Sequence, residues 1–269
     1  MDYKIVFSDI DGTLLNKERQ LSPATIQAIK KLKNKIPFVL ISARMPAAMR
    51  HLQQQLEIEE LPIISYNGAL ILVNDEVKSS TEIPVEILEE LSKWNRAHDT
   101  HLSLYNNDEW YVPAMDYWAQ REHNNTKVAP LVKSNMEVVR SWKTQGKGAH
   151  KIMAMGEVQN IENTINFLET NFAGRLHLYR SKDTYLEIAP KTISKFTAVE
   201  FLLKNHFSLS EKEAIAFGDN YNDVEMLKNI GYGVAVGNAR PEALDAANLV
   251  CESSIEDGVA KILTKLFQH

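Results

Sequence analysis

The chain has 269 residues, of which 44% are hydrophobic and 24% charged, and a formal net charge of −5 at pH 7. These values are ordinary for a globular protein of one large or two modest domains, and the acidic balance argues against a surface that binds nucleic acid. The single cysteine, Cys251, excludes a disulfide within the chain, and no apolar run approaches the roughly 18 residues of a membrane-spanning helix.

The N-terminal part alternates between two periodicities. Short apolar, partly β-branched runs indicate strands that are covered on both faces, and Ser22-Pro23 is a helix-start signal. The pattern predicts, in chain order, a strand over 4–8, a helix over 23–35, a strand over 36–42, a helix over 46–57 and a strand over 62–65. This βαβαβ order implies parallel strands with right-handed crossovers, as in a doubly wound α/β fold.

The same alternation returns near the C-terminus. It predicts strands over 214–219, 231–236 and 248–251, and helices over 222–230, 241–247 and 258–267. Because the N-terminal and C-terminal parts share the same alternation of strands and helices, we expect them to form one Rossmann-like core with a parallel sheet.

The middle of the chain has a different pattern of polar and apolar residues. Segments such as "THLSLYN" and "TYLEIA" alternate polar and apolar residues, which is typical of an antiparallel sheet with one solvated face. Helical periods lie among them at 84–97 and 158–171. We therefore predict a doubly wound parallel-sheet core of residues 1–82 and 190–269 that carries an inserted α+β domain of residues 83–189.

Polar residues follow each predicted core strand. In an open parallel sheet, ligands bind beyond the carboxyl ends of the strands, so these residues are expected at one edge. They are, strand by strand, Asp9 and Asp11; Ser42 and Arg44; Asn67 and Gly68; and Gly218, Asp219, Asn222 and Asp223. Lys195, at the start of the helix that leads back into the core, could add a cation there.

Taken singly, each residue has an ordinary explanation. An aspartate after a strand is usually a turn residue, Ser42 is typical of a helix cap, and a lone lysine such as Lys195 is usually solvated. Together they predict more, because four aspartates in one crevice repel each other unless a cation is bound. A set of oxygen ligands without His or Cys suits a hard ion such as Mg²⁺, and Mg²⁺ commonly binds substrate phosphate oxygens as well.

At this point the chain resembles a known superfamily, the haloacid dehalogenase-like (HAD) hydrolases. Its four ordered motifs are matched by "DIDGTL" (9–14), "ISAR" (41–44), "ISK" (193–195) and "GDNYND" (218–223). The stretch "YNGA" (66–69) is similar to that of the Cof-type, sugar-phosphatase-like branch, class IIB, which carries a large cap domain of the C2 type between the second and third motifs. The resemblance spans the whole chain and implies that the insert is a substrate-specificity cap.

The resemblance also implies a role for each matching residue. Asp9 would be the nucleophile that forms an aspartyl-phosphate, and Asp11 the general acid and then the general base. The other implied roles are as follows: Mg²⁺ held by Asp9, the backbone carbonyl of Asp11, Asp219 and Asp223; catalytic phosphoryl contacts from Ser42 and Lys195; and phosphate or substrate contacts from Gly12, Arg44, Asn67, Gly68 and Asn222.

The chain departs from the family pattern at two positions. Ala43 stands where the second motif usually has glycine, and Phe196 stands where glycine commonly follows the motif-three lysine. Phe196 either narrows the site or packs beneath the helix, and we favour packing. In the predicted cap, Trp110 and Trp118 are candidates for stacking on a sugar ring, but we favour cap-core positions for them.

Three functions fit these observations. The first is Mg²⁺-dependent hydrolysis of small phosphomonoesters, with sugar phosphates as the expected substrates. The second is a phosphohexomutase of a related branch, and the third a sugar-phosphate sensor with little turnover. We expect a cytoplasmic location, because the N-terminus lacks a signal-peptide pattern. We also expect a monomer or weak homodimer that binds a small phosphorylated molecule and has no nucleic-acid or membrane partner.

Overall fold

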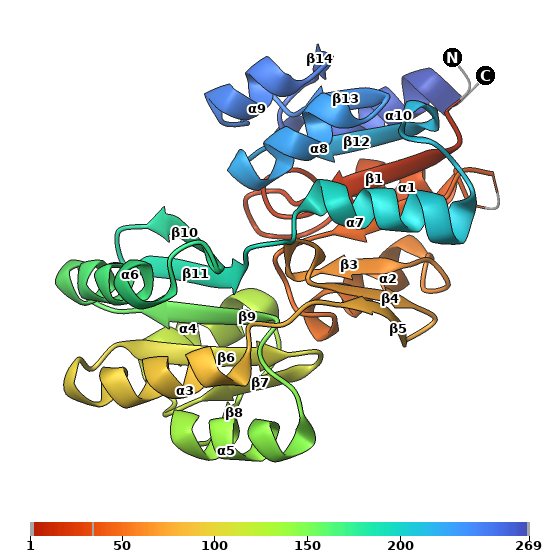
Figure 1. The fold of residues 1–269 in the computed structure, drawn as a ribbon. Coiled ribbons are helices and arrows are strands. Elements are labelled where there is room, and N and C mark those ends of the chain that lie inside the picture. Colours follow the sequence, from red (N-terminus) through yellow and green to blue (C-terminus); the bar gives the residue numbers. More distant parts are fainter. Residues whose placement is uncertain (1–2, 34, 268–269) are drawn as a thin grey trace. The chain divides into compact units, whose positions relative to one another are not determined.

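The computed structural model describes residues 3–33 and 35–267 (Figure 1). The chain divides into two compact units. Unit 1 comprises Met1–Arg44, Met49–Lys78 and Ser194–His269, and unit 2 comprises Met45–Ala48 and Ser79–Ile193. The chain therefore passes between the units at 44/45, 48/49, 78/79 and 193/194. The predicted domain limits were 82/83 and 189/190.

Unit 1 contains an eight-stranded sheet in the order β14-β13-β12-β1-β2-β3-β4-β5. The strands are β1 (Ile5–Asp9), β2 (Phe38–Ile41), β3 (Ile63–Ser65), β4 (Leu70–Val73), β5 (Glu76–Ser80), β12 (Ala214–Gly218), β13 (Tyr232–Ala235) and β14 (Leu249–Val250). All pairs from β14 to β3 are parallel, and β4 is antiparallel to β3. The predicted doubly wound α/β class is confirmed.

The strands β4 and β5 were not predicted. Both residues of the turn between them, Asn74 and Asp75, have positive φ angles of 52° and 60°. Such a turn suits a two-residue hairpin, whose strongest sequence signals carry glycine at the second position. With aspartate there, the signal is weaker, and the α/β alternation offered no place for a hairpin.

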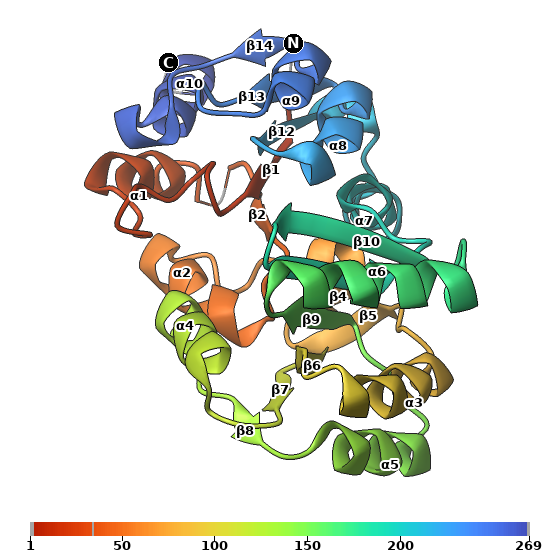
Figure 2. The same cartoon turned by 90° about the vertical axis from the view of Figure 1, so that its left-hand side faces the viewer.

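Helices cover both faces of this sheet. They are α1 (Pro23–Lys30), α2 (Ala47–Leu56), α7 (Lys195–Leu202), α8 (Val224–Asn229), α9 (Pro241–Ala246) and α10 (Gly258–Phe267). In Figure 2, α1 and α10 lie on one side of the central strands and α7 and α8 on the other. This arrangement buries both faces of the central strands, as their predominantly apolar sequences require.

The first helix is shorter than predicted. It was predicted over 23–35 but ends at Lys30. Beyond it the backbone forms tighter bonds, from the N–H of Leu32 to the carbonyl of Ile29 and from Lys33 to Lys30, and residue 34 lies outside the described residues. Among the described residues of this lysine-rich tail, Leu32 alone is buried, so little apolar surface stabilises a further turn of helix.

The face of the sheet beneath α7 and α8 has a continuous apolar core. It includes Phe7, Ile41 and Ala216 from three strands and Val199 from α7. Phe196 is partly buried and packs against this cluster, so the packing role favoured for it is confirmed. The core thus anchors the first turn of α7, which begins at Lys195.

Unit 2 contains a six-stranded sheet in the order β10-β11-β9-β6-β7-β8. Its strands are β6 (His101–Asn106), β7 (Glu109–Val112), β8 (Leu131–Val132), β9 (Lys151–Met155), β10 (Leu176–Lys182) and β11 (Tyr185–Pro190); its helices are α3 (Val85–Trp94), α4 (Tyr117–Thr126), α5 (Asn135–Gln145) and α6 (Val158–Phe172). All pairs are antiparallel except β7 with β8. The α+β character predicted for the insert is confirmed by these elements.

Two helices of unit 2 were missed. Only Ala119 is buried in α4, so that segment has no apolar helical period to detect. For α5 a signal was present, because Ser134 and Glu137 form a capping box. Trp110 is buried and stacks on Tyr105 with ring centroids 5.6 Å apart, as the favoured core position requires, whereas Trp118 is only partly buried.

Among residues 3–33 and 35–267, no helix has the length and apolar character needed to cross a membrane.

Candidate active site

A buried lysine links two aspartates at the edge of the unit 1 sheet. Asp9 is the last residue of β1, and Lys195 is the first residue of α7, which Ser194 caps by accepting the N–H of Thr197. The Nζ of Lys195 donates to Asp9 Oδ1 at 2.5 Å and to Asp223 Oδ1 at 2.6 Å. The side chains of Lys195 and Asp223 are fully buried. Residues 186 positions apart in the sequence therefore share one hydrogen-bonded centre.

Asp223 is held on both oxygens. While Oδ1 accepts from Lys195, Oδ2 accepts the backbone N–H groups of Asp219 and Asn220, each at 3.0 Å. These bonds order the loop that follows β12. Asp223 thus positions both Lys195 and the loop that carries Asp219.

Asp219 faces the segment that follows β1. Its Oδ1 accepts a hydrogen bond of 2.9 Å from Thr13 Oγ1. Gly12 has a φ of +88°, and a Cβ atom at this position would lie 2.3 Å from Asp219 Oδ2. Only glycine allows the chain to turn here and leave room for the carboxylate.

The carboxylates of Asp9, Asp219 and Asp223 form one cluster. One oxygen from each lies within 4.8 Å of the others, and this is the only such group of three or more His, Cys, Asp or Glu within residues 3–33 and 35–267. Burial raises the pKa of Asp9 well above its usual value; Lys195 opposes the rise, while Asp223 and Asp219 add to it. Burial, followed by the charge of Asp223, raises the pKa of Asp219 to about 6.

This cluster fits a divalent cation. It has three carboxylates but one ammonium group, so it lacks positive charge. Asp9 Oδ2 is buried and has no hydrogen-bond partner among the described residues, although a buried carboxylate oxygen normally has one. Because the donors are all oxygens, a hard ion such as Mg²⁺ suits them, with Asp9 and Asp219 as its side-chain ligands.

Asp11 lies in a separate cluster with two arginines. Arg44 donates from Nε to Asp11 Oδ2 at 2.7 Å and from Nη2 to Oδ1 at 2.8 Å, and Arg19 Nη2 donates to the same Oδ1 at 2.7 Å. Burial alone would raise the pKa of Asp11, but the hydrogen bonds and charge of Arg44, with help from Arg19 and Lys195, outweigh it and lower the pKa. Asp11 is therefore held as a carboxylate in this structure.

The remaining predicted residues frame the site. Ser42 is buried at the end of β2, and its Oγ accepts the N–H of Arg44 at 3.2 Å. Asn67 donates its N–H to the carbonyl of Ser42, and Asn222 Nδ2 donates to Asn67 Oδ1 at 2.9 Å. The interaction of Asn222 is thus with Asn67, whereas Lys195 bonds to Asp9 and Asp223.

Gly68 allows another close approach. It has a φ of +105°, and a Cβ atom here would lie 2.5 Å from the carbonyl oxygen of Ser194. The loop after β3 can therefore lie directly against the start of α7.

Three further residues contact the site and were not predicted: Thr13, Arg19 and Asn238. Asn238 donates from Nδ2 to the carbonyl of Gly12 at 2.8 Å, and it follows β13, so the strand-end rule could have found it. Thr13 lies within the first quoted motif. Nothing in the sequence distinguishes Arg19 from the other charged residues around it.

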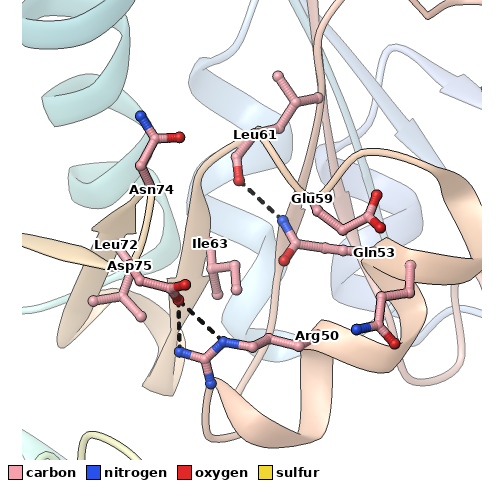
Figure 3. Close-up of a pocket in the computed structure, with 9 residues that line it drawn as sticks. Arg50, Gln53, Glu59, Leu61, Ile63, Leu72, Asn74 and Asp75 are labelled. Atoms are coloured by element: carbon pink, nitrogen blue, oxygen red, sulfur yellow. Dashed lines mark hydrogen bonds and ion pairs between the residues drawn. The ribbon is translucent and has the colours of Figure 1, made fainter.

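A hollow on unit 1 lies between α2 and the β4–β5 turn (Figure 3). Its Arg50 donates to Asp75 Oδ1 at 2.8 Å and 3.1 Å, and its Gln53 donates to the carbonyl of Leu61 at 2.9 Å. These bonds attach two segments to α2: the β4–β5 turn, and the loop between α2 and β3 that contains Leu61. The hollow is therefore explained by local structure.

Comparisons with known proteins agree with this geometry. The family model described as haloacid dehalogenase-like hydrolase matches residues 6–263, so the chain belongs to this family. A Haemophilus influenzae protein named "Putative phosphatase" is 37% identical over 271 residues, which is 99% of each chain. A solved structure of a haloacid dehalogenase-like hydrolase from Bacteroides thetaiotaomicron has a TM-score of 0.90 at 27% identity and covers 99% of this chain and 100% of that chain.

A Bacillus subtilis relative is named 5-amino-6-(5-phospho-D-ribitylamino)uracil phosphatase YitU. It is 24% identical over 271 residues, which cover 98% of this chain and 97% of the relative. Within the family, the present chain is a Cof-type hydrolase and a phosphatase that acts on small phosphorylated molecules.

Proposed function

We propose that this phosphatase is Mg²⁺-dependent and hydrolyses small phosphomonoesters, with sugar phosphates as its substrates, through an aspartyl-phosphate on Asp9. The observation that supports this most directly is the buried Asp9 carboxylate, with one oxygen bonded to Lys195 and the other without a partner among the described residues. A nucleophile needs a free oxygen, and a phosphoryl group needs nearby positive charge.

In the first step, an oxygen of Asp9 attacks phosphorus and the bond from phosphorus to the ester oxygen breaks. The electron pair of that bond goes to the leaving oxygen, which takes a proton from Asp11. Lys195 binds a phosphoryl oxygen, and Ser42 and the backbone N–H groups near Gly12 bind others. Mg²⁺ bound at Asp9 and Asp219 would supply the positive charge that lets an anionic nucleophile approach an anionic substrate.

In the second step, Asp11 takes a proton from a water molecule, whose oxygen attacks phosphorus. The bond between phosphorus and Asp9 breaks, its electron pair returns to the carboxylate, and inorganic phosphate leaves. Asp11 thus acts first as an acid and then as a base. Before the first step its carboxylate, which Arg19 and Arg44 hold ionised in this structure, must give up part of these contacts and take up from solvent the proton that it donates.

We assign substrate selection to the inserted domain, residues 83–189 in the sequence prediction. An α+β unit between the second and third motifs can cover a leaving group and exclude water. Support for a sugar-like leaving group comes from the name of the Bacillus subtilis relative, in which the phosphate is on a D-ribityl chain.

The test is a screen of phosphorylated metabolites with and without Mg²⁺, performed on the unmodified protein, Asp9→Asn and the control Asp99→Asn. Asp99 is an exposed aspartate of unit 2, so its replacement removes one carboxylate far along the chain from the motifs. We expect Asp9→Asn to lower kcat by on the order of 10⁴-fold or more while the fold is retained.

Turnover by Asp9→Asn close to that of the unmodified protein would rule out the nucleophile assignment. With a hexose 1-phosphate, free sugar is the expected product. The 6-phosphate would indicate a mutase, and binding without turnover on the whole panel would indicate a sensor.

A further inference from the structure

Arg19 occupies an unfavourable backbone position. Residues 15–21 form a short hairpin, in which the N–H of Asn16 bonds to the carbonyl of Gln20 and Leu15 pairs with Leu21. Arg19 closes the loop with a φ of +58°. Three-residue hairpin loops commonly have such a left-handed residue, and glycine or asparagine adopts this conformation at the lowest cost. Backbone chemistry therefore does not explain an arginine here, whereas a role for its side chain would.

The side chain of Arg19 reaches Asp11, which already has a charge partner. Arg44 binds both oxygens of Asp11, and its side chain is only 8% exposed. The side chain of Arg19 is 46% exposed and adds one bond to Oδ1. Among the described residues, the other N–H groups of its guanidinium have no partner. Arg19 is thus the exchangeable member of the pair, with donors left for another acceptor.

We propose that Arg19 determines specificity by binding an anionic group on the leaving group, close to the ester oxygen. The proposal rests on the proposed function, because it uses Asp11 as the acid that protonates this oxygen. A general acid must come within about 3 Å of the oxygen that it protonates. Arg19 Nη2 lies 2.7 Å from the same carboxylate, so the guanidinium is close enough to meet the first few atoms of the leaving group.

The charge of this cluster fits an anion. The single carboxylate of Asp11 accepts from both guanidinium groups, so Arg19 shares its ionic partner with Arg44. A guanidinium group binds carboxylates and phosphates with two parallel hydrogen bonds, which a hydroxyl group cannot match. The favoured substrates are therefore phosphomonoesters with a carboxylate or a further phosphate next to the ester oxygen.

The test compares the unmodified protein with Arg19→Gln and with the control Lys17→Gln. Lys17 is exposed on the same hairpin, so the control removes the same charge from the same segment. Two pairs of substrates differ in the leaving group. In 2-phosphoglycerate a carboxylate replaces one hydroxymethyl group of glycerol 2-phosphate. In adenosine 3′,5′-bisphosphate the leaving group of the 5′-ester carries a phosphate that the leaving group of AMP lacks. The aryl substrate p-nitrophenyl phosphate has a leaving group without either anion.

We expect the unmodified protein to have a higher kcat/KM for the anionic member of at least one pair, and Arg19→Gln to lower that preference about tenfold or more, mainly through KM. An effect in the glycerol pair indicates a carboxylate, and one in the adenosine pair indicates a phosphate. Lys17→Gln should keep the preference. Arg19→Gly provides a second variant, because glycine suits the left-handed position: it should be at least as stable as the unmodified protein and still lose the preference.

Two results would overturn the inference. One is an unmodified protein that prefers the neutral member of both pairs. The other is an equal loss by Arg19→Gln on all five substrates, p-nitrophenyl phosphate included, which would mean that Arg19 acts only through Asp11. Both results leave the proposed phosphatase mechanism intact, since that mechanism is tested separately, by the turnover of Asp9→Asn and by the products from the metabolite panel.

Discussion

Each unit contains a fully enclosed basic side chain, and the two have opposite pKa shifts. Burial alone would lower the pKa of Lys195, but the charges and hydrogen bonds of Asp223 and Asp9 outweigh it and raise the pKa. In unit 2, burial lowers the pKa of His150 to about 4, with Lys147 adding to the decrease and Glu82 opposing it. Lys195 is therefore kept charged and His150 neutral.

The difference arises from the partners rather than from burial. Lys195 donates to two carboxylates, whereas His150 Nδ1 accepts the N–H of Asn107 at 3.0 Å. The neutral ring therefore carries its proton on Nε2, where Ser80 Oγ lies 3.0 Å away. A second proton on Nδ1 would face another donor. Charge is thus retained on the buried base of unit 1, whereas the buried ring of unit 2 stays neutral even though Glu82 Oε1 lies 3.8 Å from its Nε2.

Replacing Lys195 should give the largest effect. Lys195→Met leaves two buried carboxylates without their cation, so we expect a loss of about 3–5 kcal/mol in the free energy of unfolding, together with loss of turnover. Denaturant unfolding and steady-state kinetics measure the two effects. Lys204→Met, at an exposed lysine soon after α7, should differ little from the unmodified protein. Equal stability of the two variants would contradict the view that Lys195 balances buried charge.

Adding Mg²⁺ should stabilise unit 1, because the cluster of three carboxylates contains only one ammonium group. A ligand present at 100 times its Kd stabilises the folded state by about 2.7 kcal/mol, which EDTA should reverse. Thermal melting with and without Mg²⁺ measures this. Asp219→Asn should remove most of the effect, while Asp11→Asn should keep it, because only the backbone carbonyl of Asp11 is assigned to the metal. Loss of stabilisation in Asp11→Asn alone would place the cation in the arginine cluster instead.

Gly12→Ala tests whether the carboxylate cluster is as tightly packed as its contacts indicate. The added Cβ would be strained by the φ of +88° and would displace Asp219, so we expect a loss of roughly 2 kcal/mol in stability and on the order of 100-fold in turnover. Gly146→Ala is the matched control: its φ is +68° and nothing lies within 4 Å of the added atom. The control should lose about 1 kcal/mol and no activity. Similar kinetics of the two variants would show that Asp219 tolerates displacement.

The smallest expected effect is a pH dependence from His150. The unfolded ring takes up a proton as pH falls below 6.5, whereas the folded ring does so only near pH 4. The neutral His150 ring thus makes its full contribution to the free energy of unfolding above pH 6.5. This contribution is lost as pH falls towards 4, and the loss is roughly 1 kcal/mol at pH 5.5. Stability curves of His150→Asn should be flatter over this range, whereas the exposed His206→Asn should match the unmodified protein. Parallel curves for all three proteins would refute the assignment.

Much of unit 1 could be predicted because its signals are local. Apolar runs and the Ser22-Pro23 cap indicated strands and a helix, and the strand-end rule selected Asp9, Asp219 and Asp223, which the structure brings within one cluster. Elements with weak local signals were missed: β4 and β5 are joined by an uncommon turn sequence, and α4 buries a single residue.

The partners within the site could not be predicted in the same way. Asp9 and Asp11 are two residues apart and equally polar in sequence, yet one bonds to Lys195 and the other to Arg19 and Arg44. Their pKa values therefore shift in opposite directions. Such partners are absent from the local sequence, since they come from α7, the hairpin and the end of β2.

Sequence alone was enough to determine the doubly wound core and the set of polar residues at the strand ends, because periodicity and strand order depend on local sequence. Only the tertiary structure decided which carboxylate meets which cation. It joins Asp9 to Lys195, directs Arg19 towards Asp11 and places His150 against the N–H of Asn107 and the hydroxyl of Ser80. The physical reason is that burial and contact between distant residues set the strength of electrostatic interactions, and both exist only once the chain has folded.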